Sequence, residues 1–105
     1  MSTDEQIYAD VFDEEIILTA QVRTVILTKH PEVADFSHEI EKALREPDEI
    51  RRSIRDERVV LYYRHVAEVL NGKWVVVVVK RLEQNFVSTI YATDQIKSGE
   101  VIWTK

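Results

Sequence analysis

The sequence predicts one α+β domain in which two N-terminal helices, preceded by a short strand, pack on a four-stranded antiparallel sheet. Apolar residues recur at helical spacing in the first half, whereas long β-branched runs separated by turn residues fill the second. With 105 residues, 2 Gly and 2 Pro, the chain is long enough for one core and has no linker or repeat. We therefore treat residues 1–105 as a single domain, with residues 1–7 as a loose tail.

The first predicted elements are a strand at residues 14–18 and a helix over Ala20–Lys29. The strand residues are β-branched and apolar, Thr19 has a side chain suited to a helix N-cap, and Pro31 ends the helix. A single helix over Asp13–Lys29 is the rival prediction. Its first turn would be favourably acidic, but it would have to accommodate many β-branched residues.

A second helix is expected to end at Glu46, just before Pro47. Either Asp35 or Ser37 has a side chain suited to its N-cap. One face of this helix carries the apolar residues Phe36, Ile40, Ala43 and Leu44.

The sheet is predicted from three long runs and one short run. Val59–Leu70 and Lys73–Leu82 are joined by Asn71-Gly72, a pair typical of two-residue hairpin turns. Phe86–Thr93 follows as a third strand, and Val101–Trp103 adds a short edge strand after a turn.

The second of these strands is valine at every position from Val75 to Val79, so it is expected to be central and covered on both faces. The helices provide one cover. A second subunit or a ligand is the expected other cover, and homodimerisation through this face is therefore one hypothesis.

The two turns decide which side chains share a face. A two-residue turn at Asn71-Gly72 places His65 opposite Val78 and Tyr63 opposite Lys80. If the second turn is Gln84-Asn85, one side of the sheet holds the polar set Tyr63, His65, Lys80, Thr89 and Tyr91. The other side then holds the apolar set Val66, Val75, Val77, Val79, Ile90 and Ala92.

This assignment depends on the length of the second turn. One residue more in that loop would move Thr89 and Tyr91 to the other side of the sheet. Lys80 is expected to face Thr89 in the predicted register. Arg64 falls on the side opposite Lys80.

The formal net charge of −5 argues against a protein that coats nucleic acid through bulk electrostatics. The acidity belongs to residues 1–28, which hold six acidic residues and one basic residue. A cluster of arginines further on alternates with acidic residues, which is typical of a solvated, salt-bridged strand and turn. Its members are Arg45, Arg51, Arg52, Arg55, Arg58 and Arg64.

Several classes of protein are excluded by what the sequence lacks. The acidic start and the shortness of the apolar runs give no signal peptide or membrane span, and the chain has no Cys, so we expect a cytoplasmic protein. There is no glycine-rich phosphate loop and no serine nucleophile motif. His30 and His38, with Glu32 and Asp35 between them, match no standard zinc spacing, so neither a metal nor a cofactor is expected.

The residue types on the polar side suit metal-free cleavage of RNA, in which the 2′-hydroxyl attacks the adjacent phosphate. Either His30 or His65 would exchange protons, and Lys80 or Arg64 would stabilise the charged phosphorane. Tyr63 or Tyr91 would stack a base or orient the phosphate. The alternative is structural: the tyrosines form a cross-strand cluster, Lys80 keeps the edge soluble and His65 pairs with a polar neighbour.

Short motifs follow one another along residues 14–103: Thr19, Lys29-His30-Pro31-Glu32, Ile40–Leu44, Glu46-Pro47-Asp48-Glu49-Ile50, Tyr62-Tyr63-Arg64, Lys80 and Val87-Ser88-Thr89-Ile90-Tyr91. Their order resembles the phage-associated branch of the barnase, EndoU, colicin and RelE-like nucleases. The resemblance implies an α+β domain with a four-stranded antiparallel sheet and a toxin-like ribonuclease activity without a metal. It also implies RNA as substrate and an antitoxin-like protein as a partner.

By motif, His30 matches the helix-end histidine of this family and Arg64 matches the arginine after its tyrosine pair. Thr89 and Tyr91 match the polar pair of the late strand, so Thr89 joins the candidate catalytic residues.

One departure from the family pattern matters. The pattern has a further histidine in the first helix before an isoleucine, where this chain has Val25 before Ile26. A catalytically inactive relative, acting as a homodimeric or partner-binding interaction domain, is therefore the alternative to the ribonuclease.

Overall fold

A computed structural model describes residues 5–30, 35–66 and 73–105 of the chain. In order, its elements are β1 (Gln6–Ala9), β2 (Glu15–Leu18), α1 (Ala20–Lys29), α2 (Phe36–Arg45), β3 (Glu49–Ser53), β4 (Val59–Val66), β5 (Lys73–Arg81), β6 (Asn85–Thr93) and β7 (Gly99–Thr104). The strands form one sheet in the order β1-β2-β6-β5-β4-β3-β7. β2 and β6 run parallel, and the other neighbouring strands run antiparallel.

The prediction of a four-stranded antiparallel sheet is wrong, because the described sheet has seven strands and is mixed. The sequence does not predict β1 and β3 as strands of the sheet, and it predicts β2 only as a short strand outside the four-stranded sheet. β1 was expected to belong to a loose tail, of which residues 1–4 lie outside the described part. β3 is rich in charged residues and was expected only as part of a strand and turn. β3 has no apolar run and that of β1 is only Ile7-Tyr8-Ala9, so tertiary contacts determine the conformation of both segments.

Local signals around the first helix are confirmed. The Thr19 hydroxyl accepts a hydrogen bond from the Val22 N–H, and this N-cap separates β2 from α1, so the rival single helix is wrong. α2 begins after Asp35, whose side chain makes no capping hydrogen bond, and Glu46 follows its last residue.

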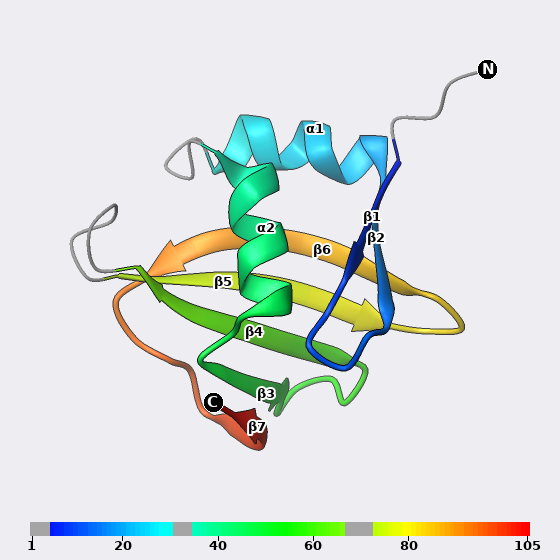
Figure 1. The fold of residues 1–105 in the computed structure, drawn as a ribbon. Coiled ribbons are helices and arrows are strands. Elements are labelled where there is room, and N and C mark those ends of the chain that lie inside the picture. Colours follow the sequence, from blue (N-terminus) through cyan, green and yellow to red (C-terminus); the bar gives the residue numbers. More distant parts are fainter. Residues whose placement is uncertain (1–4, 31–34, 67–72) are drawn as a thin grey trace.

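Both helices pack on the same side of the sheet, with α1 over β6 and α2 across β5 and β4 (Figure 1). The core lies between the helices and this side. Its fully buried members include Ile26, Ile40, Ala43 and Leu44 from the helices and Val75, Val77, Val79 and Ile90 from the sheet. The predicted apolar side of the sheet is therefore confirmed.

Neither described helix is long and apolar enough to cross a membrane.

The predicted register of the central hairpin is wrong by four residues. Tyr63 lies opposite Val76 and His65 lies opposite Trp74, whereas Lys80 lies opposite Val59. The predicted Asn71-Gly72 turn lies outside the described residues. The observed register places Lys80 near the end of β5, away from the fully buried Tyr63, and so avoids the cost of burying a charge.

A β-bulge determines the side on which the last half of β6 faces. The turn after β5 has three residues, since Arg81 pairs with Asn85. Without compensation, this turn would place Thr89 and Tyr91 on the helix side. Ser88 is an extra residue between the pairs Val79↔Val87 and Val78↔Thr89, and it restores the predicted side.

The acidic N-terminal segment is tied to the sheet by a buried carboxylate. Asp10 has no exposed surface, and its Oδ2 accepts a 2.6 Å hydrogen bond from the Tyr62 hydroxyl. Arg81 donates to the same hydroxyl over 2.7 Å and to Asp10 Oδ2 over 3.4 Å. Asp10 Oδ1 accepts from the backbone N–H groups of Phe12 and Glu14, each over 2.9 Å. Each oxygen of this buried carboxylate is therefore satisfied by two donors.

The turn between β1 and β2 is also held by α2. Arg45, in the last turn of α2, donates to the Asp10 carbonyl over 3.0 Å and to Asp13 over 2.9 Å. Asp13 has a φ of 64°, a left-handed conformation that Asp tolerates better than most residues. The turn therefore joins β1, β2 and α2.

We expect Tyr62→Phe to destabilise the protein by about 1–3 kcal/mol, because Asp10 and Arg81 would each lose a buried hydrogen-bond partner. Urea unfolding at neutral pH measures this. Tyr8→Phe is the control, because the Tyr8 hydroxyl bonds Ser37 and Gln6 in a partly exposed place, and it should cost less. Equal losses for the two variants would contradict the role given to Tyr62.

We also expect stability to fall as the pH rises above 10. Burial, followed by the hydrogen bond to Asp10, raises the pKa of Tyr62 well above its ordinary value of 10.0. Above that pH the unfolded chain releases the proton that the folded chain keeps, so unfolding is favoured by up to about 1.4 kcal/mol per pH unit. Tyr62→Phe should reduce this slope in urea titrations, and an unchanged slope would show that Tyr62 does not cause it.

Gly99→Ala should destabilise the start of β7. A Cβ at this position would lie 2.5 Å from the Arg52 carbonyl oxygen on β3, so the two strands would have to separate. We expect a loss of about 1–3 kcal/mol in urea unfolding. Ser98→Ala, one residue earlier and exposed, is the control and should remain close to the unchanged protein.

Candidate functional site

The side of the sheet opposite the helices, here called the open face, carries most of the residues singled out from the sequence. The backbone register places on it Leu61, Tyr63 and His65 of β4, Trp74, Val76, Val78 and Lys80 of β5, and Thr89 and Tyr91 of β6. The predicted grouping of Tyr63, His65, Lys80, Thr89 and Tyr91 on one side is therefore confirmed. These residues are nevertheless spread along the strands.

His30, Tyr91 and Lys97 come together at the β6 side of the open face. The His30 and Tyr91 ring centroids are 6.2 Å apart, and Lys97 Nζ lies 5.7 Å from the centroid of the Tyr91 ring. An imidazole and an ammonium group thus both lie close to one aromatic ring. We call these three residues the Tyr91 cluster.

Each member of the Tyr91 cluster is positioned by a different segment. His30 is the C-cap of α1, and its N–H bonds the Ile26 carbonyl over 2.9 Å. Ile26 is the buried anchor of α1 in the core over the sheet, so the helix brings His30 past the edge of β6. Lys97 belongs to the 94–98 connection between β6 and β7.

This connection crosses the open face because β6 and β7 lie far apart in the sheet order. The Lys97 N–H donates to the Tyr63 hydroxyl over 3.2 Å, and Arg51 of β3 donates to the Lys97 carbonyl over 3.3 Å. Ile96 packs on the cluster of Leu61, Tyr63 and Val76. The second cover expected from another subunit or a ligand is thus supplied in part by the chain itself.

Tyr63 lies beneath this crossing and has no exposed surface. Burial raises the pKa of its hydroxyl, which accepts the hydrogen bond from Lys97. Tyr63 therefore supports the position of Lys97 and is not placed to stack on a base. Tyr91, about 10 Å away across β5, remains partly exposed.

The other two proton-transfer and cation candidates lie at opposite ends of the open face. His65 is exposed, and its ring meets Trp74 edge-on with centroids 5.0 Å apart. Lys80 is six residues further along β5 than Trp74, about 20 Å away. These two residues therefore do not converge on one phosphate.

Arg64 lies on the helix side, where it donates to Glu39 of α2 over 3.4 Å. The predicted register also placed Arg64 and Lys80 on opposite sides, and this is confirmed. Arg64 thus does not share the open face with the Tyr91 cluster.

Thr89 lies two residues before Tyr91 on the same side of β6, opposite Val78. The predicted pairing of Thr89 with Lys80 is wrong, because the three-residue turn after Arg81 places Phe86 opposite Lys80. Thr89 is the hydroxyl-bearing neighbour of Tyr91 along the strand.

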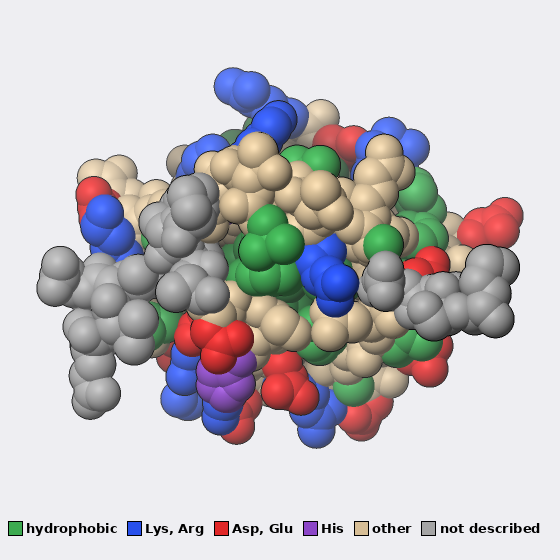
Figure 2. All heavy atoms as spheres, turned by 90° about the horizontal axis from the view of Figure 1, so that it is seen from above, with side chains coloured by type: hydrophobic (Ala, Val, Ile, Leu, Met, Phe, Trp, Pro, Cys, Tyr) green, Lys and Arg blue, Asp and Glu red, His purple; other side chains and the backbone are tan. Residues whose placement is uncertain are grey.

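Burial raises the pKa of the Tyr91 hydroxyl above its ordinary value. The hydroxyl therefore keeps its proton at neutral pH and can donate a hydrogen bond to an anionic oxygen. Charged side chains of both signs are interspersed over the surface seen from above, on the α1 side of the molecule (Figure 2).

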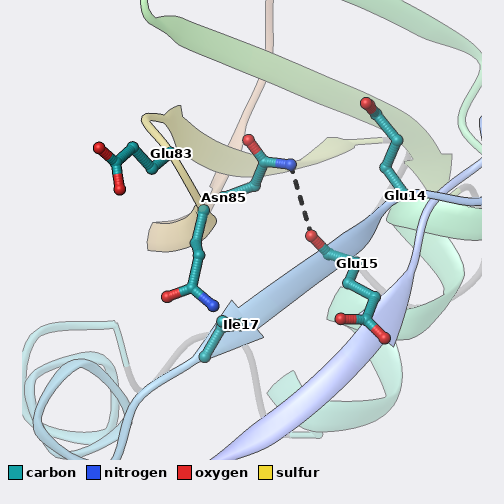
Figure 3. A pocket seen from close by; sticks show the side chains of 6 residues that line it. Glu14, Glu15, Ile17, Glu83 and Asn85 are labelled. Atoms are coloured by element: carbon teal, nitrogen blue, oxygen red, sulfur yellow. Dashed lines mark hydrogen bonds between the residues drawn. The ribbon is translucent and has the colours of Figure 1, made fainter.

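An acidic pocket elsewhere is less suited to phosphate. It has a volume of about 320 Å³ and lies where β2 meets the turn before β6, lined in part by Glu14, Glu15 and Glu83. Their carboxylates point in different directions (Figure 3), and Glu14 is bonded to Arg81 over 2.7 Å. Within residues 5–30, 35–66 and 73–105, no group of three His, Cys, Asp or Glu side chains is arranged to hold a metal ion.

Lys97 was not singled out from the sequence. It lies in a turn-like segment between two strands, and no local pattern distinguishes it from other exposed lysines. Only the path of the chain from β6 across to β7 brings it to Tyr91. A long connection between strands that do not pair is the signal that would have identified it.

No protein-family model matches the chain, and comparison with curated proteins and with solved structures gives no significant match either. The functional argument therefore rests on the arrangement of this chain's own side chains.

The contact between His30 and Tyr91 can be tested by NMR. Tyr91→Leu removes the aromatic ring current, so the Hε1 resonance of His30 should move. His38, on α2, is the internal control and should keep its chemical shift. Equal shifts for both histidines, or none for His30, would contradict the Tyr91 cluster.

Proposed function

We propose that this protein is a metal-independent endoribonuclease that binds single-stranded RNA on the open face and cleaves it at the Tyr91 cluster. The observation that carries the proposal is that His30 and Lys97 both lie close to the Tyr91 ring. A proton-transfer group and a cation are what 2′-hydroxyl attack on a phosphate needs, and an aromatic ring can stack the adjoining base.

In the proposed reaction, neutral His30 takes the proton of the RNA 2′-hydroxyl, and the 2′-oxygen forms a bond to phosphorus. The bond between phosphorus and the 5′-oxygen breaks, that oxygen takes up a proton from water, and protonated His30 gives its proton to the hydroxide that remains. The products are a 2′,3′-cyclic phosphate and a 5′-hydroxyl end. Lys97 stabilises the negative charge that develops on the phosphorane.

Tyr91 and Thr89 orient the RNA. The Tyr91 ring offers a stacking surface for a base, and its protonated hydroxyl is a donor for a phosphate oxygen. Trp74 and His65 offer a second aromatic surface further along the open face. Lys80 lies about 14 Å from Tyr91 and would contact the RNA backbone away from the reacting phosphate.

The resemblance of the motifs to the phage-associated barnase, EndoU, colicin and RelE-like nucleases supports the same proposal. We place the activity in the cytoplasm, where RNA is available, in keeping with the absence of Cys. An antitoxin-like protein covering the open face would then be the natural inhibitor.

RNA cleavage in the presence of EDTA tests the proposal. The unchanged protein should produce fragments with 2′,3′-cyclic phosphate ends from synthetic single-stranded RNA. His30→Ala should lower the rate about 10²- to 10⁴-fold through loss of proton transfer. Lys97→Ala should lower it about 10²- to 10³-fold through loss of charge stabilisation.

Two substitutions on the helix side serve as matched controls. His38→Ala removes an exposed histidine of α2, and Lys42→Ala removes a lysine paired with Glu46 on the same helix. Both should cleave at the unchanged rate. Cleavage by the unchanged protein no faster than by His30→Ala would overturn the proposal and favour the alternative, a non-catalytic interaction domain with Val25 in place of a histidine.

A further inference from the structure

Close to the Tyr91 cluster, a hollow of about 350 Å³ opens between the turn after β3 and the connection before β7. We call it the Arg55 hollow. Its lining residues are Ser53, Ile54, Arg55, Leu61, Lys97 and Ser98. Leu61 is on the open face of β4, and Lys97 belongs both to this lining and to the Tyr91 cluster.

The charge in the Arg55 hollow is not neutralised by neighbouring carboxylates. Arg55 stands out from the other arginines between residues 45 and 64, each of which forms an ion pair with a carboxylate. Within the described ranges, neither Arg55 nor Lys97 has an ion-pair partner. Asp56, the acidic residue next to Arg55, is held by Arg58 through hydrogen bonds of 3.2 and 3.3 Å.

The remaining lining residues suit a base and a sugar. Ile54 is 73% exposed, the highest value among the large exposed hydrophobic side chains described, and Leu61 lies beside it in the lining. Ser53 Oγ accepts a hydrogen bond from the Arg55 N–H, so its own proton is available to a ligand oxygen. Ser98 adds a second hydroxyl. Cations, apolar surface and hydroxyls thus line one small volume.

We infer that the Arg55 hollow is a nucleotide subsite of the proposed RNA-binding face. A phosphate lies against Arg55, and the attached base lies against Ile54. This inference rests on the proposed function for the identity of the ligand as single-stranded RNA, but it assigns roles to Arg55 and Ile54, which the cleavage reaction does not use.

The distance between the two sites determines the length of RNA that uses both. Tyr91 and Tyr63 lie on either side of Val76, and Leu61 is two residues before Tyr63 on β4. The Arg55 hollow is therefore about 12 Å from Tyr91. A dinucleotide held at Tyr91 does not fill the hollow, whereas a hexanucleotide reaches it. Affinity should therefore increase with RNA length.

Fluorescence anisotropy with fluorescein-labelled 2′-O-methyl hexauridine tests the subsite, because this probe binds but lacks the attacking hydroxyl. Arg55→Ala should weaken binding about 5- to 10-fold and lower the slope of log K against log salt concentration by about 0.7, as expected for one phosphate contact. Ile54→Ser should weaken binding with no change in the salt slope. Both side chains are exposed, so folding should be unaffected.

Lys42→Ala is the matched control for net charge, and it should bind the hexanucleotide as the unchanged protein does. Equal binding by Arg55→Ala, Ile54→Ser and Lys42→Ala would overturn the subsite, even if RNA is cleaved at His30. Binding that depends on Arg55 and Ile54 would support the subsite, even if no cleavage occurs and the proposed ribonuclease function fails.

Discussion

The architecture depends on one buried carboxylate. Asp10 is removed from water, which is costly for a charge, and the cost is offset by the Tyr62 hydroxyl, the Arg81 guanidinium and two backbone N–H groups. These contacts attach the β1–β2 turn to β4 and to the end of β5. β2 pairs with β6, and Thr19 directly after β2 is the N-cap of α1, which runs over β6. The location of His30 is thus a distant consequence of where Asp10 is buried.

The two sides of the sheet differ in how much of the chain covers them. Both helices cover one side and form an apolar core, whereas among the described segments the 94–98 connection is the one that crosses the other side. Rigid strands hold Tyr91 and Thr89, and the crossing strap is anchored by Tyr63 and Arg51. The side chains proposed to bind RNA are therefore held on ordered backbone, which would limit the entropy lost on binding.

Local signals in the sequence predicted much of the fold but not its sheet. Thr19, Pro31 and the apolar spacing in α2 gave the helices nearly to the residue, because caps and periodicity act over a few positions. β1 and β3 were missed because long-range pairing, not composition, makes them strands. The site was only partly predictable for the same reason. His30 and Tyr91 lie in recognisable sequence motifs. Lys97 was missed because only the path of the 94–98 connection brings it to Tyr91, and Arg55 was missed because the sequence does not show that its neighbour Asp56 pairs with Arg58.

The extra residue at Ser88 makes the length of β6 depend on the length of the turn that precedes it. The three-residue turn after β5 and the bulge each reverse the side on which β6 faces, and together they cancel. Descendants of this sequence that lengthen or shorten the turn by one residue can keep Tyr91 on the open face only by also losing the bulge. Insertions and deletions in this hairpin should therefore be inherited in compensating pairs. A single insertion or deletion without a second, compensating change would move Tyr91 from the open face to the helix side of the sheet.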